Sequence, residues 1–157
     1  MILGIDPGLG GALAFYWPDS QECEIFDTPT HAIEIAGSKR RVIDLYQLAG
    51  LISHRAPHAR MAIIEDVHAM PKQGVTSSFT FGFVAGAAQG IVAAYRIPTH
   101  LVKPAAWKRQ LGLTADKDAS RRKASQMFPQ HANLWPNKGH DGRAEALLLA
   151  WYGSKLA

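Results

Sequence analysis

The first eleven residues constrain the fold of this chain more than any other stretch. Residues 1–5 are an apolar run, Met-Ile-Leu-Gly-Ile, which predicts a buried strand that ends at a lone carboxylate, Asp6. Residues 7–11, Pro-Gly-Leu-Gly-Gly, then predict a tight turn. Burying an unpaired carboxylate costs several kcal/mol of desolvation free energy. We therefore expect a cation or a metal ion beside Asp6.

A second apolar strand, predicted over residues 61–64, also ends in acid, at Glu65 and Asp66. The carboxyl ends of parallel, adjacent strands open onto the same crevice of a sheet. Asp6 and Glu65 would then face each other, and a divalent cation would turn their repulsion into shared attraction. This pattern favours a metal ion over a basic side chain as the partner of Asp6.

The remaining elements follow from periodicity and from turn residues. Residues 12–17 and 22–27 predict two more strands, which form an antiparallel meander with the first, and residues 28–41 predict an exposed loop. The later expected elements are a helix over 42–55, a long helix over 77–95, a strand over 97–102, a helix over 114–127, a loop over 128–139 and a final helix over 141–152.

Three glycines, Gly82, Gly86 and Gly90, recur at four-residue spacing in the long helix. Each costs about 1 kcal/mol relative to alanine inside a helix, so we expect a close backbone approach on that side. Two interpretations remain: the stripe packs against the sheet, or it crosses a partner in a dimer.

The composition indicates one globular domain over residues 1–157. The single cysteine, Cys23, excludes a disulfide framework and fits a reducing cytosol. The opening apolar run reaches an acid at position 6 without a basic segment before it, so we expect no signal peptide. The longest apolar helix segment, taken as residues 83–95, is too short to span a bilayer. The sequence thus predicts a cytoplasmic protein that does not use a membrane.

The charge is divided unevenly along the chain. Residues 1–95 hold six Lys and Arg against nine Asp and Glu, whereas residues 96–157 hold eleven against four. This asymmetry favours a polyanionic partner bound by the second half, with an ordinary solvated basic surface as the alternative. Phosphates and an exposed base favour cations interleaved with an aromatic side chain. The candidate DNA contacts are Lys72, Lys103, Trp107, Lys108, Arg109, Lys117, Arg121 and Arg122.

The final helix begins with two acids, Asp141 and Glu145, which share a face because they are four residues apart. Acids in a first turn also suit the helix dipole, which is the simpler interpretation. Together with Asp6 and Glu65 they form an oxygen-rich set suited to Mg²⁺ or Mn²⁺. Two such ions about 4 Å apart can activate a water and stabilise a leaving oxygen. With the basic second half, this predicts metal-dependent hydrolysis of a nucleic acid strand.

Four segments resemble one known family. Residues 2–9 resemble the N-terminal signature of the RuvC family of Holliday junction resolvases, and residues 62–65 resemble its second acidic motif. Residues 86–92 are similar to the family's central helix, and residues 144–147 to its final acidic helix. The order and the separations of these motifs match along nearly the whole chain.

The resemblance implies an α/β RNase H-like fold: a five-stranded mixed sheet, three strands antiparallel and two parallel, flanked by helices. It implies a crossover junction endodeoxyribonuclease, a homodimer that nicks opposing strands of a four-way DNA junction with Mg²⁺. Asp6 and Glu65 would be metal ligands. Lys103 and Lys117 resemble the family's basic residues near the scissile phosphate, with Lys108 as an alternative to Lys117.

One position departs from the family pattern. The last motif usually holds two ligands three residues apart, and here Glu145 takes the second place while the first is Gly142. We expect Asp141 to substitute, with His140 as an additional candidate ligand. Relatives probe the junction centre from the loop after the second acid, where the candidates are Val67, His68 and Met70.

Other functions fit parts of the same pattern. An Asp before a glycine turn also opens the actin and sugar-kinase ATPases, but those close a second domain over the nucleotide. A less selective nuclease of flaps or other branched DNA, or a non-catalytic binder of branched DNA, remains an alternative. Sequence preference at the cleavage site and a branch-migration helicase partner stay open.

Overall fold

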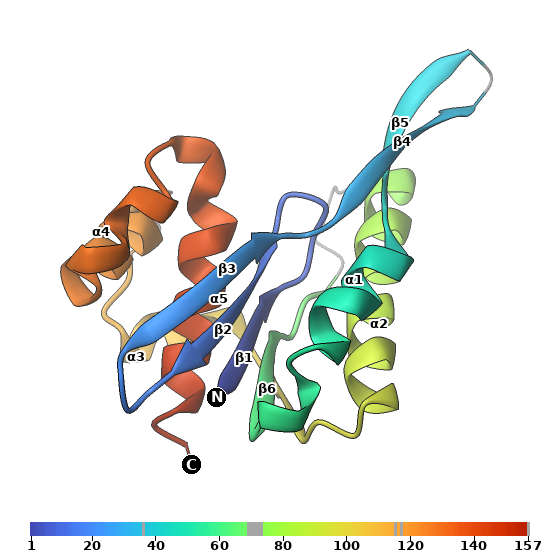
Figure 1. Cartoon of the computed structure of the whole chain (residues 1–157). Helices are drawn as coiled ribbons and strands as arrows, with labels where there is room; N and C mark the ends of the chain where they lie inside the picture. The colour runs from blue at the N-terminus through green and yellow to red at the C-terminus, as the bar shows by residue number, and fades with distance from the viewer. Residues whose placement is uncertain (36, 69–73, 115, 117, 157) are drawn as a thin grey trace.

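The computed structural model describes the whole chain except residues 36, 69–73, 115, 117 and 157. Its centre is a five-stranded sheet with the strand order β3-β2-β1-β6-β7 (Figure 1). The strands are β1 (Ile2–Asp6), β2 (Ala12–Trp17), β3 (Glu22–Asp27), β6 (Met61–Glu65) and β7 (Thr99–Val102). β2 is antiparallel to β1 and to β3, whereas β6 runs parallel to β1 and to β7. The predicted mixed sheet is confirmed.

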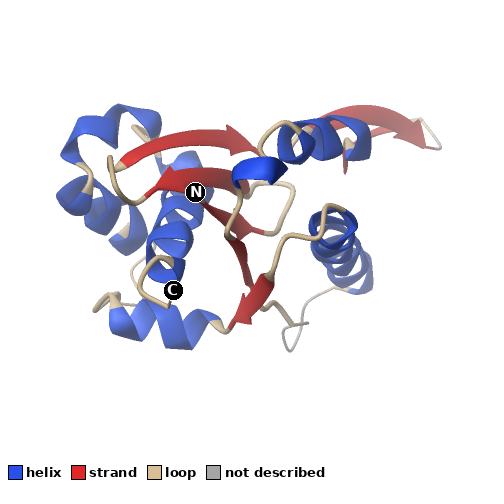
Figure 2. Cartoon of the chain, turned by 60° about the horizontal axis from the view of Figure 1, so that its bottom comes forward, coloured by secondary structure: helices blue, strands red, loops and turns tan. Residues whose placement is uncertain are grey.

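Helices cover both faces of this sheet (Figure 2). Two crossover helices, α1 (Leu45–Ser53) and α2 (Val75–Ala94), pack on the face formed by Leu3, Ile5 and their neighbours. The opposite face is covered by α3 (Pro104–Gln110), α4 (Ala119–Met127) and α5 (Asp141–Gly153). The described residues also form three short 3₁₀ helices, at Ala56–His58, Pro129–Leu134 and Lys138–His140.

Residues in β1 alternate between these faces, as a strand requires. Leu3 and Ile5 join the α1/α2 core, whereas Ile2 joins the α5 core. The same alternation assigns the side chain of Asp6 to the α5 face. In β6, Ile63 belongs to the α5 core, so Glu65 lies on that face too.

Residues 28–41 do not form the predicted loop. They contribute to an antiparallel hairpin of β4 (Thr30–Ile35) and β5 (Ser38–Ile43), which we call the arm. The arm reaches away from the rest of the molecule (Figure 1). The prediction failed because the segment is short and polar, and cross-strand pairing rather than a buried face stabilises it.

The glycine stripe of α2 does not pack on the sheet. Gly82, Gly86 and Gly90 are exposed, and a Cβ added at any of them would meet no described atom within 4 Å. The helix packs inward through Val84, Ala85, Ala88 and Val92. The sheet-packing interpretation is therefore wrong, and the crossing of a partner remains a proposal.

Helix α2 is also longer than the apolar segment that the sequence predicted. Its 20 residues have a mean hydropathy of 1.3 over the most apolar window, which suffices by length and composition alone to cross a membrane. Helices that cover a sheet can meet the same criterion, and α2 covers one here. Its outer side exposes Val75, Phe79 and Phe83.

Helix α4 begins at Ala119, five residues later than predicted. The hydroxyl of Thr114 accepts a hydrogen bond from the Asp116 N–H, and the Asp116 carboxylate accepts one from the Asp118 N–H. Such local bonds offer the backbone an alternative to the helix. The side chains of Thr114 and Asp116 therefore accept backbone hydrogen bonds ahead of the helix instead of capping it.

Candidate active site

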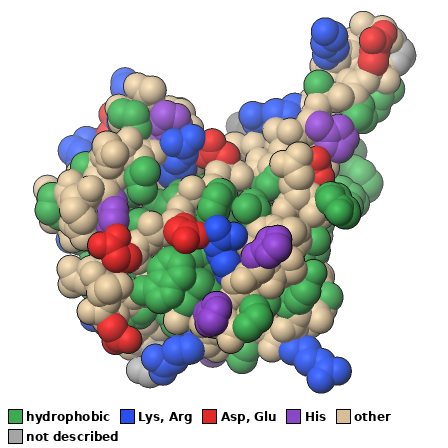
Figure 3. Space-filling model, in the orientation of Figure 1, with side chains coloured by type: hydrophobic (Ala, Val, Ile, Leu, Met, Phe, Trp, Pro, Cys, Tyr) green, Lys and Arg blue, Asp and Glu red, His purple; other side chains and the backbone are tan. Residues whose placement is uncertain are grey.

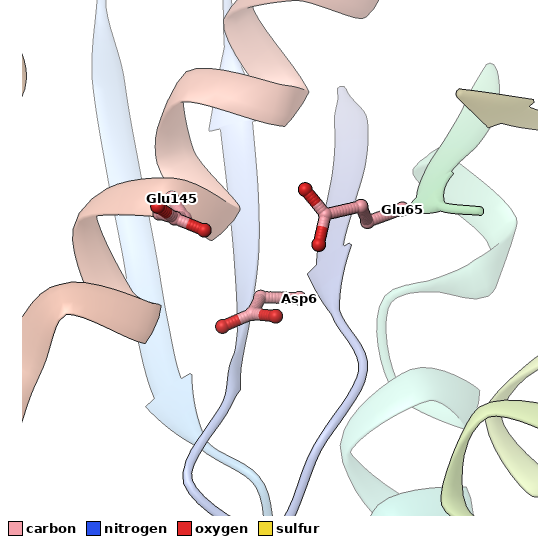
Figure 4. Close-up of side chains that lie close together, drawn as sticks. All are labelled: Asp6, Glu65 and Glu145. Atoms are coloured by element: carbon pink, nitrogen blue, oxygen red, sulfur yellow. The ribbon is translucent and has the colours of Figure 1, made fainter. Parts of the chain in front are cut away.

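Three carboxylates converge at the edge of the sheet where β1 and β6 end. Asp6 and Glu65 come from these strands and Glu145 from the second turn of α5. One oxygen of each lies within 4.8 Å of one oxygen of the other two. In Figure 4 the three side chains point into one space between α5 and the two strands. The sequence predicted this meeting for Asp6, Glu65 and Glu145.

Two glycines let α5 approach the sheet closely enough to place Glu145. A Cβ on Gly4 would lie 2.1 Å from the Ala146 carbonyl oxygen and 2.6 Å from the Ala150 nitrogen. A Cβ on Gly142 would lie 2.7 Å from the Gly10 carbonyl oxygen and 2.9 Å from Oδ2 of Asp6. At position 142 the RuvC family usually has a metal ligand, but here the backbone packs so closely against the glycine turn that a side chain has no room.

Two of the three acids are held by neighbouring hydrogen-bond donors. Nε1 of Trp107 donates to Oε1 of Glu65 at 2.9 Å, and both side chains are buried. Oε1 of Glu145 accepts from Nζ of Lys108 at 2.9 Å and from Oγ of Ser120 at 2.7 Å. These bonds fix the orientation of two of the three carboxylates.

Burial and mutual repulsion shift the protonation of this cluster. Burial, followed by the charges of Glu145 and Glu65, raises the pKa of Asp6 to about 8. Burial also raises the pKa of Glu65, against the opposing effect of the Trp107 hydrogen bond. Burial lowers the pKa of Lys108, but the charge and hydrogen bond of Glu145 outweigh it, so that pKa is raised overall. A metal ion, as a second cation beside Lys108, would relieve the repulsion that remains among the three carboxylates.

The donor set suits a hard divalent cation. All three groups are carboxylates, and Mg²⁺ and Mn²⁺ prefer oxygen ligands. Among the described residues, Lys108 already places a positive charge beside these carboxylates, and its side chain is one-third exposed. The cluster therefore has the chemistry of a metal site that keeps a lysine beside it.

The two other predicted ligands lie outside this group. Asp141 is exposed, and its Oδ1 accepts a hydrogen bond from the Gly142 N–H at 3.2 Å. His140 directs Nδ1 toward the Asn137 N–H at 3.4 Å. Asp141 is close enough to influence the pKa of Asp6 weakly, but within the described chain it does not share the common space.

The predicted DNA contacts divide into four groups. Trp107 is fully buried, so the expectation that it offers an exposed aromatic face is wrong. Lys108 points to Glu145, and Arg121 and Arg122 form ion pairs with Asp118 and Asp116. Lys103 and Arg109 are exposed. Lys72 and Lys117, together with the junction-probe candidate Met70, lie outside the described residues.

Two supporting contacts were not predicted. Ser120 is buried on α4, and no local pattern distinguishes it from other serines. Arg143 donates from two guanidinium nitrogens to the two oxygens of Asp27, each at 2.6 Å, and so ties α5 to the end of β3. The charge of Arg143 between two acids was a signal that sequence reasoning did not use.

The sequence matches no protein-family model and no curated protein. Solved structures do match. RuvC of T. thermophilus in complex with a Holliday junction substrate superposes with a TM-score of 0.61 at 14% identity, covering 98% of this chain and 94% of that chain. A second Thermus thermophilus RuvC structure has a TM-score of 0.49 at 16% identity, with 98% and 95% covered.

At this low identity the likeness concerns the fold. The strand order, the parallel and antiparallel pairings and the full coverage agree with it. The chain has the RuvC-like form of the RNase H fold, with an acidic cluster at the edge of its sheet.

Proposed function

We propose that this chain is a divalent-metal-dependent endodeoxyribonuclease that resolves four-way (Holliday) DNA junctions. The observation that carries the proposal is the convergence of Asp6, Glu65 and Glu145 at the carboxyl ends of two parallel strands. The similar RuvC structure is described in complex with a Holliday junction substrate, which supports the choice of substrate. We place this activity in a single domain of a cytoplasmic protein.

In this proposal Asp6, Glu65 and Glu145 hold Mg²⁺, or Mn²⁺ in its place, with Asp141 as a ligand recruited on binding. The ions would supply an activated water and stabilisation for the leaving oxygen of the phosphodiester. Lys108 holds Glu145 in position and carries positive charge next to the reacting phosphate. Lys103 follows Val102, which pairs with Glu65, so its exposed side chain suits a phosphate at the same edge.

Paired nicks across a junction require two sites, and we propose a homodimer. Its interface would be the outer side of α2, where three exposed glycines run beside Phe79 and Phe83. Small residues allow helices to approach closely, and exposed aromatic side chains are typical of protein interfaces. A less selective nuclease of flaps, or a non-catalytic binder of branched DNA, is the alternative.

The test is cleavage of labelled four-way junction, flap and linear duplex DNA with and without Mg²⁺. We expect the wild type to nick the junction in preference to the duplex. Asp6→Asn should reduce cleavage at least about a thousandfold, because it removes a ligand essential to the metal chemistry, and should leave junction binding intact. Arg60→Gln is the control, because Arg60 precedes the amino end of β6, whereas the acidic cluster lies at the carboxyl end. Cleavage by Asp6→Asn at the wild-type rate would place the active site elsewhere.

A further inference from the structure

The arm carries a charge pattern that the acidic cluster does not account for. Lys39, Arg40 and Arg41 lie together on β5, and Glu34 is the only acid in residues 30–43. All three basic side chains are exposed, and none forms an ion pair in the described part of the chain. Figure 3 shows basic side chains at the tip and at the base of the projecting arm.

The pairing register distributes these cations over both faces of the ribbon. Opposed residues of an antiparallel pair point to the same side. Arg40 pairs with Ile33, whereas Lys39 pairs with Glu34 and Arg41 with Ala32. Arg40 therefore projects from one face, and Lys39 and Arg41 project from the other.

The root of the arm lies beside the acidic cluster. Asp6 pairs with Ala12, and Ala12 pairs with Asp27, so these residues form one row across three strands. With about 4.8 Å between strands, Asp27 is roughly 10 Å from Asp6. Backbone bonds from the Thr28 N–H to the Gly11 oxygen (2.9 Å) and from the Asp44 N–H to the Pro29 oxygen (2.8 Å) fix the root there.

The arm is long enough to follow a nucleic acid groove. Six residues of strand extend roughly 20 Å, which corresponds to about six phosphates along one DNA strand. The major groove of B-DNA admits a two-stranded ribbon and has phosphates on both walls. A ribbon with cations on both faces matches that geometry, whereas the core of a protein interface is depleted of charge.

We propose that the arm binds the duplex that flanks the cleavage site, with Lys39, Arg40 and Arg41 contacting its phosphates. This inference rests on the proposed function, since it assigns the arm to the same DNA substrate. The exposed Ile35 and the half-buried Ile33, both on the Arg40 face, would lie toward the groove floor, where apolar contact with thymine methyl groups is available.

The test compares two variants that lose the same charge. The arm variant is Lys39→Gln, Arg40→Gln, Arg41→Gln. The control is Arg60→Gln, Arg96→Asn, Lys155→Gln, three exposed cations distant from the arm, of which Arg60 and Arg96 precede the amino ends of β6 and β7. Binding of a fluorescent four-way junction and of a duplex is measured by anisotropy in EDTA over about 50–300 mM salt.

We expect the arm variant to bind about tenfold or more weakly near 0.1 M salt, with a log–log salt slope shallower by about 2 to 3. The control should change both quantities far less. Equal behaviour of the two variants would overturn the proposal. So would a shift in the monomer–dimer equilibrium of the arm variant with DNA binding unchanged, because the arm would then contact a second copy of the chain.

Cleavage by the wild type with Mg²⁺ separates this proposal from the proposed function. If the arm variant loses affinity and the wild type cuts no DNA, the arm is a DNA contact and the nuclease function is wrong. If the wild type cuts the junction and both variants bind it equally, the function stands and the arm proposal is wrong.

Discussion

The acidic cluster and the root of the arm lie roughly 10 Å apart along one row of the sheet, yet they are held in opposite ways. Asp6, Glu65 and Glu145 come from three elements that pack on one another, and Trp107, Ser120 and Lys108 hold two of them. The arm relies mainly on the hydrogen bonds of its own two strands. Metal chemistry needs fixed geometry, whereas a groove contact benefits from a segment that adjusts to its partner.

The largest effect is expected from a substitution that disrupts the packing of α5 behind the acidic cluster. Gly4→Ala should lower the free energy of unfolding by more than about 3 kcal/mol, because the new Cβ would meet the backbone of α5. Urea unfolding measures it. Gly50→Ala in α1 is the control, since a Cβ there meets nothing within 4 Å, and it should stabilise by about 1 kcal/mol or less. A small effect of Gly4→Ala would show that α5 can move outward at little cost.

The second effect is a pH dependence of the metal-free protein. Burial raises the pKa of Asp6 to about 8 in the fold, from an ordinary value of 3.8. Between these values the folded state binds the extra proton, so stability falls as pH rises, by at most about 1.4 kcal/mol per pH unit, and levels off above pH 8. Melting temperatures from pH 5 to 9 in EDTA measure this effect.

Asp6→Asn isolates this contribution, because the other titrating groups remain. The wild type should lose stability relative to Asp6→Asn as pH rises, and saturating Mg²⁺ should remove the wild-type loss. Parallel curves for the two proteins would mean that Asp6 is already ionised in the metal-free fold.

A smaller effect concerns the donor that holds Glu65. Trp107→Phe keeps a buried ring but removes the Nε1–H, so we expect about 1–2 kcal/mol of destabilisation and roughly tenfold weaker Mn²⁺ binding. Titration calorimetry measures the affinity. Trp135→Phe is matched, because Trp135 is equally buried and donates to Ser125 at 2.8 Å away from the acids. If both variants weaken Mn²⁺ binding alike, the Trp107 bond does not position Glu65.

The smallest effect on stability is expected from removing the arm. Replacing residues 31–42 with a short Gly-Ser loop should change the free energy of unfolding by no more than about 0.5 kcal/mol, because most of these side chains are exposed. Thermal unfolding measures it, and the pH dependence due to Asp6 should persist. A large loss of stability would mean that the arm is an integral part of the core.

Much of this organisation could be predicted from local patterns. Apolar runs that end in acid at Asp6 and Glu65 predicted the two central strands, and their alternation is sufficient to assign both acids to one face. The arm could not be predicted in this way, since its strands have little buried surface. The role of Trp107 was misjudged because its partner Glu65 is 42 positions away.

The sequence by itself determined that carboxylates end two parallel strands and begin the last helix, because strand alternation and helix spacing are local properties. Only the tertiary structure decided which acids meet. Helix α5 is buried through five consecutive residues, 146–150, so its apolar pattern does not specify its rotation. The close approach at Gly4 and Gly142 specifies it, and brings Glu145 to Asp6 while Asp141 stays exposed.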